Sequence, residues 1–151
     1  MKLKATEFIA LLLTALVTGV FWGTWFRLTR SLGNFTPAEF IHIGKTIIAN
    51  VAVPMRIIMP ATFLLMLLVM WQSRRAYKHS LYLYTGSFLF MIVTLIITVA
   101  VEAPIDNQIK TWTVDTLPGN WESLRNTWDQ FHTLRTCTSV TSLCFFGLGM
   151  I

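Results

Sequence analysis

Charged residues are scarce in this chain of 151 residues. Only 13% of them are Asp, Glu, Lys or Arg, whereas soluble domains average about 25%. No charged residue occurs in the runs 8–26, 57–72, 81–101 and 143–151. The strict alternation of apolar and polar residues that is typical of a half-buried strand is also missing. These absences exclude an ordinary soluble domain.

The long uncharged runs predict membrane-spanning helices. About 20 residues at a rise of 1.5 Å cross the hydrocarbon core, so a run of about 18 apolar residues is a candidate span. The sequence places such spans at roughly 7–27, 54–72, 80–102 and 132–151. Because backbone groups in lipid must be hydrogen-bonded within their own segment, helices are expected. We predict an all-α integral membrane four-helix bundle, folded as one transmembrane domain over residues 1–151.

Cysteine and dense basic patches are scarce as well. Cys137 and Cys144 are the only cysteines. Their spacing in one helix separates the Cα atoms by about 10 Å, too far for a disulfide bond. The net charge of +5 comes mainly from Lys and Arg near the ends of the apolar runs, where such residues anchor a helix to lipid headgroups. We therefore expect the lipid bilayer as a partner, and no nucleic acid.

The distribution of Lys and Arg predicts the orientation. The short segments "MKLK" and "SRRAYKHS" are densely basic and stand next to helix ends. Basic residues at such positions favour the cytoplasm. We predict that both termini are cytoplasmic, in a bacterial inner membrane, and that the longer segments 28–53 and 103–131 face outside.

The outer segments carry helix signals of their own. Thr36 can cap a helix that has Pro37 at its first position and Glu39 at its third. In the other segment, Asn120 can cap a helix with Glu122 in its first turn. Amphipathic helical extensions on the outer side are therefore expected.

Small residues recur in the first predicted span. Ala15, Gly19 and Gly23 stand four residues apart, a spacing that lets helices approach closely in lipid. Two interpretations are open: close packing inside the bundle, or the contact face of a homo-oligomer.

Polar side chains gather at the outer ends of the predicted spans. Glu102 and Asp106 stand one helical turn apart at the end of the third span. Trp128, His132 and Arg135 occupy positions i, i+4 and i+7, on one face of the helix that leads into the fourth span. A cation at membrane depth is costly unless it is paired. The two carboxylates are therefore the expected partners of Arg135 and of Arg56, the cation at the start of the second span.

The second predicted span brings further polar groups to the same depth. Asn50 and Arg56 flank its start, while Asn107 follows the carboxylates of the third span. Ionisable groups at membrane depth are candidates for functional residues. Two interpretations remain open: a shared site, or structural ion pairs beside an aromatic belt at the membrane surface.

A metal centre is an alternative within the same set of residues. His42, His132, Glu102 and Asp106 offer the nitrogen and oxygen donors that iron, copper or zinc accept. However, the sequence has no pair of histidines at i, i+4 and no His-Glu motif. The first expectation is therefore no cofactor, and a transition metal is the alternative.

Four stretches carry a resemblance to a known family. They are "GVFWGTWF", "TPAEFIHIGKTIIANVAVP", "APIDNQI" and the spaced series Pro118, Trp121, Arg125, Trp128, His132 and Arg135. Together they resemble the anthrone oxygenase family, which has a large bacterial branch of four-helix membrane proteins. The family typically carries amides around the proline after the third helix. Here Glu102 and Asp106 stand in those places, and Asn107 follows.

The resemblance implies oxidation of an anthrone to an anthraquinone by dioxygen, without a bound cofactor. The chemistry needs a base, groups that hold an anion, and a dry pocket. His132 suits the base, and Asn107 and Arg135 suit the anion holders. The residues expected to contact the lipophilic substrate are Glu102, Asp106, Trp128, Arg56 and Asn50.

A second class of function stays open beside this enzyme. A membrane protein that binds a lipid, a hydrophobic ligand or a membrane partner without turnover would show the same apolar spans. The discriminating feature is whether His132, Asn107 and Arg135 line one cavity.

Overall fold

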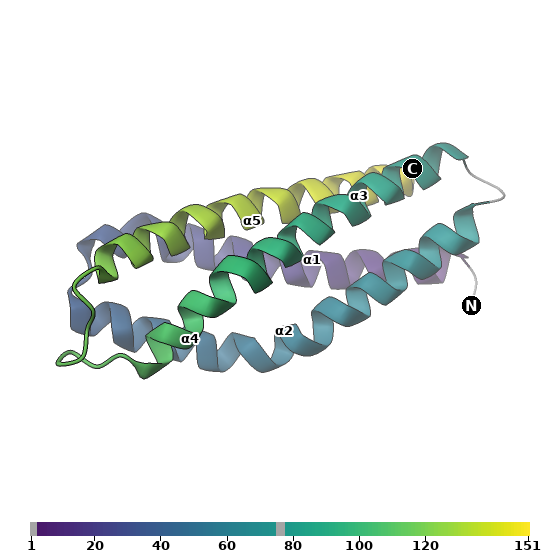
Figure 1. Cartoon of the computed structure of the whole chain (residues 1–151). Helices are drawn as coiled ribbons and strands as arrows, with labels where there is room; N and C mark the ends of the chain where they lie inside the picture. Colours follow the sequence, from purple (N-terminus) through teal and green to yellow (C-terminus); the bar gives the residue numbers. More distant parts are fainter. Residues whose placement is uncertain (1–2, 75–77) are drawn as a thin grey trace.

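The computed structural model describes residues 3–74 and 78–151, and every regular element in these ranges is helical (Figure 1). In chain order the elements are α1 (Leu3–Arg27), a 3-10 helix (Thr29–Asn34), α2 (Pro37–Ser73), α3 (Lys78–Ile97), a π-helical segment (Thr98–Glu102), α4 (Ala103–Thr111) and α5 (Trp121–Gly149).

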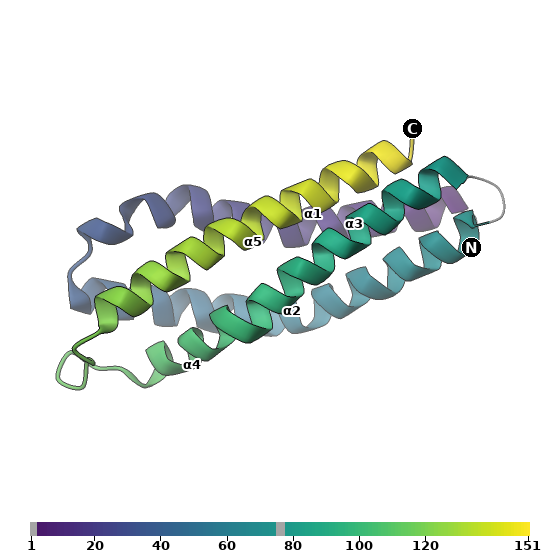
Figure 2. The same ribbon diagram turned by 45° about the horizontal axis from the view of Figure 1, so that its top comes forward.

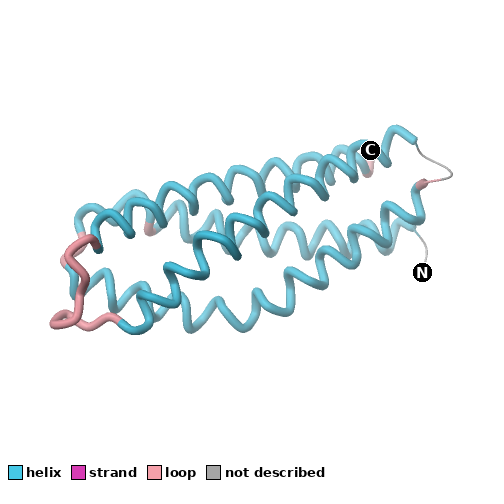
Figure 3. The backbone as a smooth tube through the Cα atoms, in the orientation of Figure 1, coloured by secondary structure: helices cyan, strands magenta, loops and turns pink. Residues whose placement is uncertain are grey.

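The helices form a bundle of four rods that lie side by side (Figures 1 and 2). α3, the π-helical segment and α4 make one continuous rod, Lys78–Thr111. Both termini lie at one end of the bundle, which we call the terminal end. The loop 112–120 and the turn 28–36 lie at the opposite end, which we call the loop end (Figure 3).

Three of the rods are long and apolar enough to cross a membrane. Their best windows, in α1, α2 and the rod Lys78–Thr111, have mean hydropathies of 1.8, 2.0 and 2.4, yet only 28% of each window is buried inside the bundle. The remaining apolar surface faces outward and needs lipid to cover it. The predicted all-α integral membrane four-helix bundle is thereby confirmed.

The fourth rod, α5, is less apolar than the other three, and it is not among the described helices that meet the same criterion. Its polar residues turn inward: Thr136, Ser139 and Ser142 are all at most 2% exposed. Ser142 and Ser87 of α3 each donate a hydroxyl hydrogen bond of 2.7 Å to the other's carbonyl oxygen. Thr136 and Ser139 donate to carbonyl oxygens of α5 itself, so all three buried hydroxyl groups have partners. The fourth membrane span remains a prediction.

The predicted outer extensions are present, with two differences. Thr36 and Glu39 form a reciprocal capping box, and α2 then runs on through Pro54. Asn120 does precede α5, but its side chain makes no capping hydrogen bond, so that expectation was wrong. The third rod also continues nine residues further, through α4, because Pro104 falls in the first turn of α4, where a missing N–H costs nothing.

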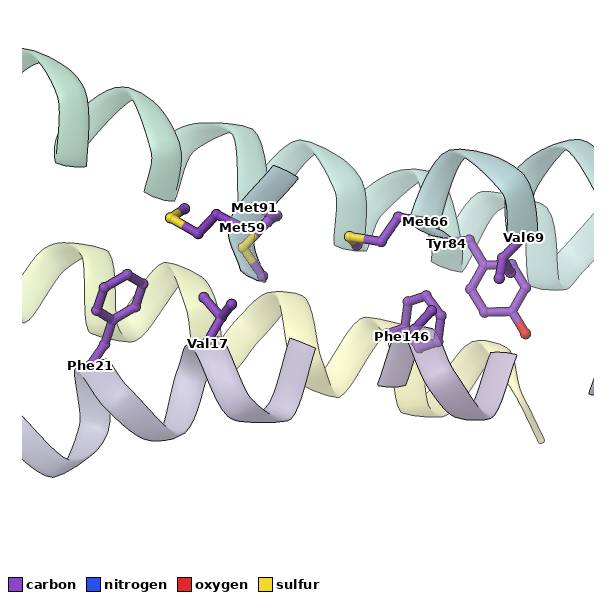
Figure 4. Close-up of a cluster of buried hydrophobic side chains, with 9 residues drawn as sticks. Val17, Phe21, Met59, Met66, Val69, Tyr84, Met91 and Phe146 are labelled. Atoms are coloured by element: carbon purple, nitrogen blue, oxygen red, sulfur yellow. The ribbon is translucent and has the colours of Figure 1, made fainter. Parts of the chain in front are cut away.

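The apolar core fills the bundle from its middle to the terminal end (Figure 4). Near the terminal end, Tyr84 packs on Phe146 with ring centroids 5.0 Å apart. Its hydroxyl donates a 2.6 Å hydrogen bond to Glu7. A Cβ added to Gly149 would come within 2.6 Å of the Tyr84 ring, so only glycine permits this approach. The residues of this cluster are Ala10, Val17, Phe21, Met59, Met66, Val69, Tyr84, Met91 and Phe146. A second apolar cluster packs at the loop end and consists of Leu32, Phe40, Ile41, Ile48, Ile105, Ile109, Trp112 and Trp128.

The small residues of α1 do not pack inside the bundle. A Cβ added to Gly19 or Gly23 would meet no atom within 4 Å. The interpretation as a close contact inside the bundle was therefore wrong for these two glycines, and a homo-oligomer stays a prediction. Cys137 and Cys144 are free thiols on the outer surface.

Candidate functional site

A cavity of about 430 Å³ opens in the half of the bundle nearer the loop end. Its exposed wall residues come from α2 and from the rod that contains α4, which places the mouth between these two elements. Most of the wall is apolar and is contributed by Val20, Phe21, Ile47, Ile48, Val51, Met55, Met59 and Leu95. The polar wall residues include Arg56, Asp106, Asn107, Lys110, His132 and Arg135.

His132 and Arg135 form the polar centre of the wall. His132 is 1% exposed and Arg135 is 8% exposed. Arg135 donates to His132 Nδ1 from Nε at 3.1 Å and from Nη2 at 2.7 Å. A guanidinium can only donate, so His132 Nδ1 is the acceptor. Its Nε2 then carries the proton and donates to the Phe21 carbonyl at 3.2 Å, which fixes the neutral Nε2–H tautomer.

Glu102 supplies the counter-charge of Arg135. Arg135 Nη2 lies 3.0 Å from Glu102 Oε2, and Glu102 is fully buried. The carboxylate comes from the last residue of the π-helical segment, and such widened turns are common at functional sites. Arg135 also lies over the Phe21 ring, with its guanidinium carbon 4.7 Å from the ring centroid. Ion pair, cation–π contact and imidazole together hold the guanidinium in one orientation.

Trp128 connects this centre to Asp106. The indole Nε1 donates a 3.1 Å hydrogen bond to Asp106 Oδ1. The same indole stacks on the His132 ring, with centroids 4.8 Å apart and planes 7° from parallel. An unbroken series of contacts thus runs from Asp106 through Trp128, His132 and Arg135 to Glu102.

The helical spacing explains how these residues meet. Trp128, His132 and Arg135 are all buried, as their common face on α5 predicts. His132 contacts neither carboxylate directly, because Trp128 and Arg135 stand between. Glu102 and Asp106 face the same helix from consecutive turns of the third rod, which is possible only because that rod stays helical past Pro104.

The remaining predicted residues occupy different places. Asn107 and Arg56 line the cavity and are exposed at its mouth, where Lys110 donates a 2.9 Å hydrogen bond to Asn107. Asn50 and His42 are exposed on α2 and are not among the cavity residues. His132, Asn107 and Arg135 therefore do line one cavity, as the enzyme hypothesis requires, and Asn50 lies outside it.

The alternative metal set does not come together. His132 has both nitrogens engaged by Arg135 and Phe21, and His42 is outside the cavity. Within residues 3–74 and 78–151, no three His, Cys, Asp or Glu side chains converge as a metal centre would need.

Two residues of the site were missed by the sequence reasoning. Phe21 supplies a carbonyl to His132 and a ring to Arg135, but it stands in a run that is apolar throughout and gives no signal. Lys110 reaches the cavity mouth. It follows Asp106 by four residues, so extending the helix past Asn107 would have placed it on the same face.

A family model described as anthrone oxygenase matches residues 45–145 of the chain. The matched range contains the whole contact series from Glu102 to Arg135, together with Arg56. No curated protein and no solved structure matches the chain.

Proposed function

This chain belongs to the anthrone oxygenase family, and on that premise we propose that it is a small membrane oxygenase acting on a lipophilic aromatic substrate of the anthrone or phenol type. One observation carries the proposal: Asp106, His132 and Arg135 stand together in the wall of a mostly apolar cavity of about 430 Å³. Small-molecule sites have this character, with a few placed polar groups in an apolar pocket of roughly 300–1,000 Å³.

The proposed reaction begins with removal of a proton. A base takes a proton from the ring methylene of the anthrone. The electron pair then delocalises onto the oxygen of the anthrone carbonyl group, which becomes an oxyanion. Arg135 is the group that holds this oxyanion, because its guanidinium is fixed by Glu102 and His132 before substrate arrives. Preorganised donors of this kind stabilise developing charge without the cost of reorientation.

Dioxygen is the oxidant. The carbanion passes one electron to dioxygen, and the resulting radical pair combines to a peroxide at the former methylene carbon. The peroxide takes up the proton held by the base and then loses water, leaving a carbonyl group. One oxygen atom enters the product and the other leaves as water. The electrons come from the substrate, so the proposal requires no cofactor.

We propose Asp106 as the base, with Arg135 as the anion holder and Asn107 beside it. Asp106 lies in the cavity wall, and one of its oxygens is oriented by Trp128. A carboxylate suffices as base for a carbon acid when the oxyanion is well stabilised. His132 remains the alternative base, but its Nδ1 lone pair would be free only after Arg135 moved away. We assign His132 the role of orienting Arg135.

The test is oxygen consumption by the purified protein in lipid nanodiscs with anthrone as substrate. We expect Asp106→Asn to lower turnover about 10²–10⁴-fold, the usual contribution of a general base. Asp115→Asn is the matched control, because Asp115 is an exposed carboxylate of the loop end outside the cavity. Oxygen consumption that never exceeds the spontaneous oxidation of anthrone would overturn the proposal.

A non-catalytic function has support from one observation. Both nitrogens of the only buried histidine are already engaged, as in a site built for rigidity. A protein that binds a lipid or hydrophobic ligand, or a membrane partner, is the second candidate. Stable binding of anthrone without oxygen consumption by the wild-type protein would favour it.

We further propose that both termini face the cytoplasm of a bacterial inner membrane. The termini lie at the same end of the bundle (Figure 1), and the basic residues Lys4, Arg74 and Lys78 stand at the ends of the helices there. Asp115→Cys, in a variant with Cys137 and Cys144 replaced by serine, should react with an impermeant maleimide added to whole cells. Reaction only after the cells are broken would reverse the orientation.

A further inference from the structure

Two cations stand at the mouth of the cavity without a carboxylate partner. Arg56 lines the cavity from α2, and Lys110 lines it from α4. Both are exposed. Within the described ranges, the one ion pair of Lys or Arg with a carboxylate joins Arg135 to Glu102. Lys110 directs its ammonium to the amide oxygen of Asn107, at 2.9 Å.

The charged residues of the cavity wall therefore differ between its interior and its mouth. Inside the cavity, Asp106 and Arg135 oppose one another, and Glu102 lies buried directly behind Arg135. At the mouth, the charged wall residues are Arg56 and Lys110, and the neutral Asn107 lies beside them. An apolar interior whose mouth carries two cations, neither within salt-bridge distance of a described carboxylate, matches a ligand with an apolar body and one anionic end.

We propose that the ligand of this cavity is an aromatic acid whose rings occupy the apolar interior and whose ionised carboxylate lies at the mouth against Arg56 and Lys110. The inference rests on the proposed function and narrows its substrate class. A guanidinium binds a carboxylate with two parallel hydrogen bonds. The acid group would orient the ring system, so that its far end meets Asp106 and Arg135.

Apolar residues at the mouth point to entry of the ligand from the bilayer. The exposed wall residues include Pro60 of α2 and Val99 of the π-helical segment, both inside apolar runs. An amphipathic acid resides at the membrane surface with its rings in the lipid and its charge at the headgroups. Such an acid would enter the cavity from the lipid between α2 and the third rod, with its charged group still at the headgroups.

Binding of a matched pair of fluorescent probes tests the inference. Anthracene-9-carboxylate and anthracene-9-carboxamide have similar shapes and differ in charge at pH 7. For the wild-type protein in phosphatidylcholine nanodiscs, we expect the acid to bind about tenfold more tightly than the amide, equivalent to about 1.4 kcal/mol. Arg56→Gln should remove most of this preference while leaving amide binding unchanged. Lys45→Gln, on the same helix but outside the cavity, should leave both affinities unchanged.

The outcomes separate the inference from the proposed function. Equal affinities of the wild-type protein for the two probes would overturn the inference, and anthrone oxidation would still decide the proposed function. A protein that binds neither probe also overturns the inference, and oxygen consumption with anthrone again decides the proposed function. Nanodiscs with one third phosphatidylglycerol distinguish the source of the anion. A preference that survives there supports a small-molecule acid, whereas its loss would mean that Arg56 holds a lipid phosphate and would overturn the inference.

Discussion

The two ends of the bundle each bury a carboxylate, but the two carboxylates have different partners and different surroundings. At the terminal end, Glu7 accepts a 2.6 Å hydrogen bond from the neutral phenol of Tyr84, and tightly packed side chains surround the pair. At the loop end, Glu102 lies 3.0 Å from the cation of Arg135, and an open cavity adjoins Arg135. The same helices thus surround one carboxylate with packed side chains and place the other behind the wall of a cavity.

The difference shows what a site requires beyond polar residues. A buried carboxylate with one neutral donor satisfies its local hydrogen bonding and has no space for a ligand. A preorganised guanidinium beside a cavity presents donors to whatever enters. Substitutions at the loop end should therefore affect turnover, whereas substitutions at the terminal end should affect stability. This contrast leads to four predictions, from the largest effect to the smallest.

Arg135→Lys should lower turnover of anthrone about 10²–10³-fold, the effect of removing one preorganised oxyanion donor. An ammonium cannot bridge Glu102 and His132 as the planar guanidinium does. Steady-state oxygen consumption measures the loss, and Arg27→Lys, at the exposed end of α1, is the control. Unchanged turnover would mean that the loop end is no more catalytic than the terminal end.

His132→Ala and His132→Gln distinguish an orienting role from a base. The glutamine amide can accept from Arg135 and donate to the Phe21 carbonyl, but it cannot take up a proton. If His132 orients Arg135, the glutamine variant should keep turnover within about tenfold of wild type, while alanine loses more. Comparable losses of about 10²–10⁴-fold in both variants would instead identify His132 as the base.

Tyr84→Phe should destabilise the protein by about 1–3 kcal/mol, because Glu7 keeps its burial and loses its donor. Turnover of the folded protein should not change. Reversible unfolding in mixed micelles measures the free energy, with Tyr82→Phe as the control, since Tyr82 is 76% exposed on the same helix. A selective loss of turnover in Tyr84→Phe would show that the two ends are coupled.

Ser87→Ala should have the smallest effect, about 0.6 kcal/mol, the average for hydrogen bonds between membrane helices. It removes the hydroxyl that bonds to Ser142 across the α3–α5 interface, three residues beyond Tyr84 along α3. Thr85→Ala is the control, because Thr85 bonds only within its own helix. The same unfolding measurement should rank Ser87→Ala below Tyr84→Phe, and a reversed ranking would show that the α3–α5 interface outweighs the terminal end.

The helices and the common face on α5 were predictable because both follow from local periodicity. Uncharged runs predicted the rods, and the capping box at Thr36 was read from residue types alone. The spacing of Trp128, His132 and Arg135 placed them together. The pairing of Arg135 with Glu102 also followed, since a cation at this depth needs an anion. The same expectation was wrong for Arg56, which forms no ion pair with a described carboxylate.

The sequence determined the membrane fold and which polar residues share a depth, because hydropathy and helical period are properties of neighbouring residues. The tertiary structure alone decided which of those residues touch and where space remains between them. Phe21 contributes a carbonyl oxygen and a ring to the site, whereas Asn50 lies outside the cavity. Trp128 and Arg135 lie between His132 and the two carboxylates. Such outcomes depend on the packing of rods from distant parts of the chain, where rotations of a fraction of a turn exchange one lining residue for another.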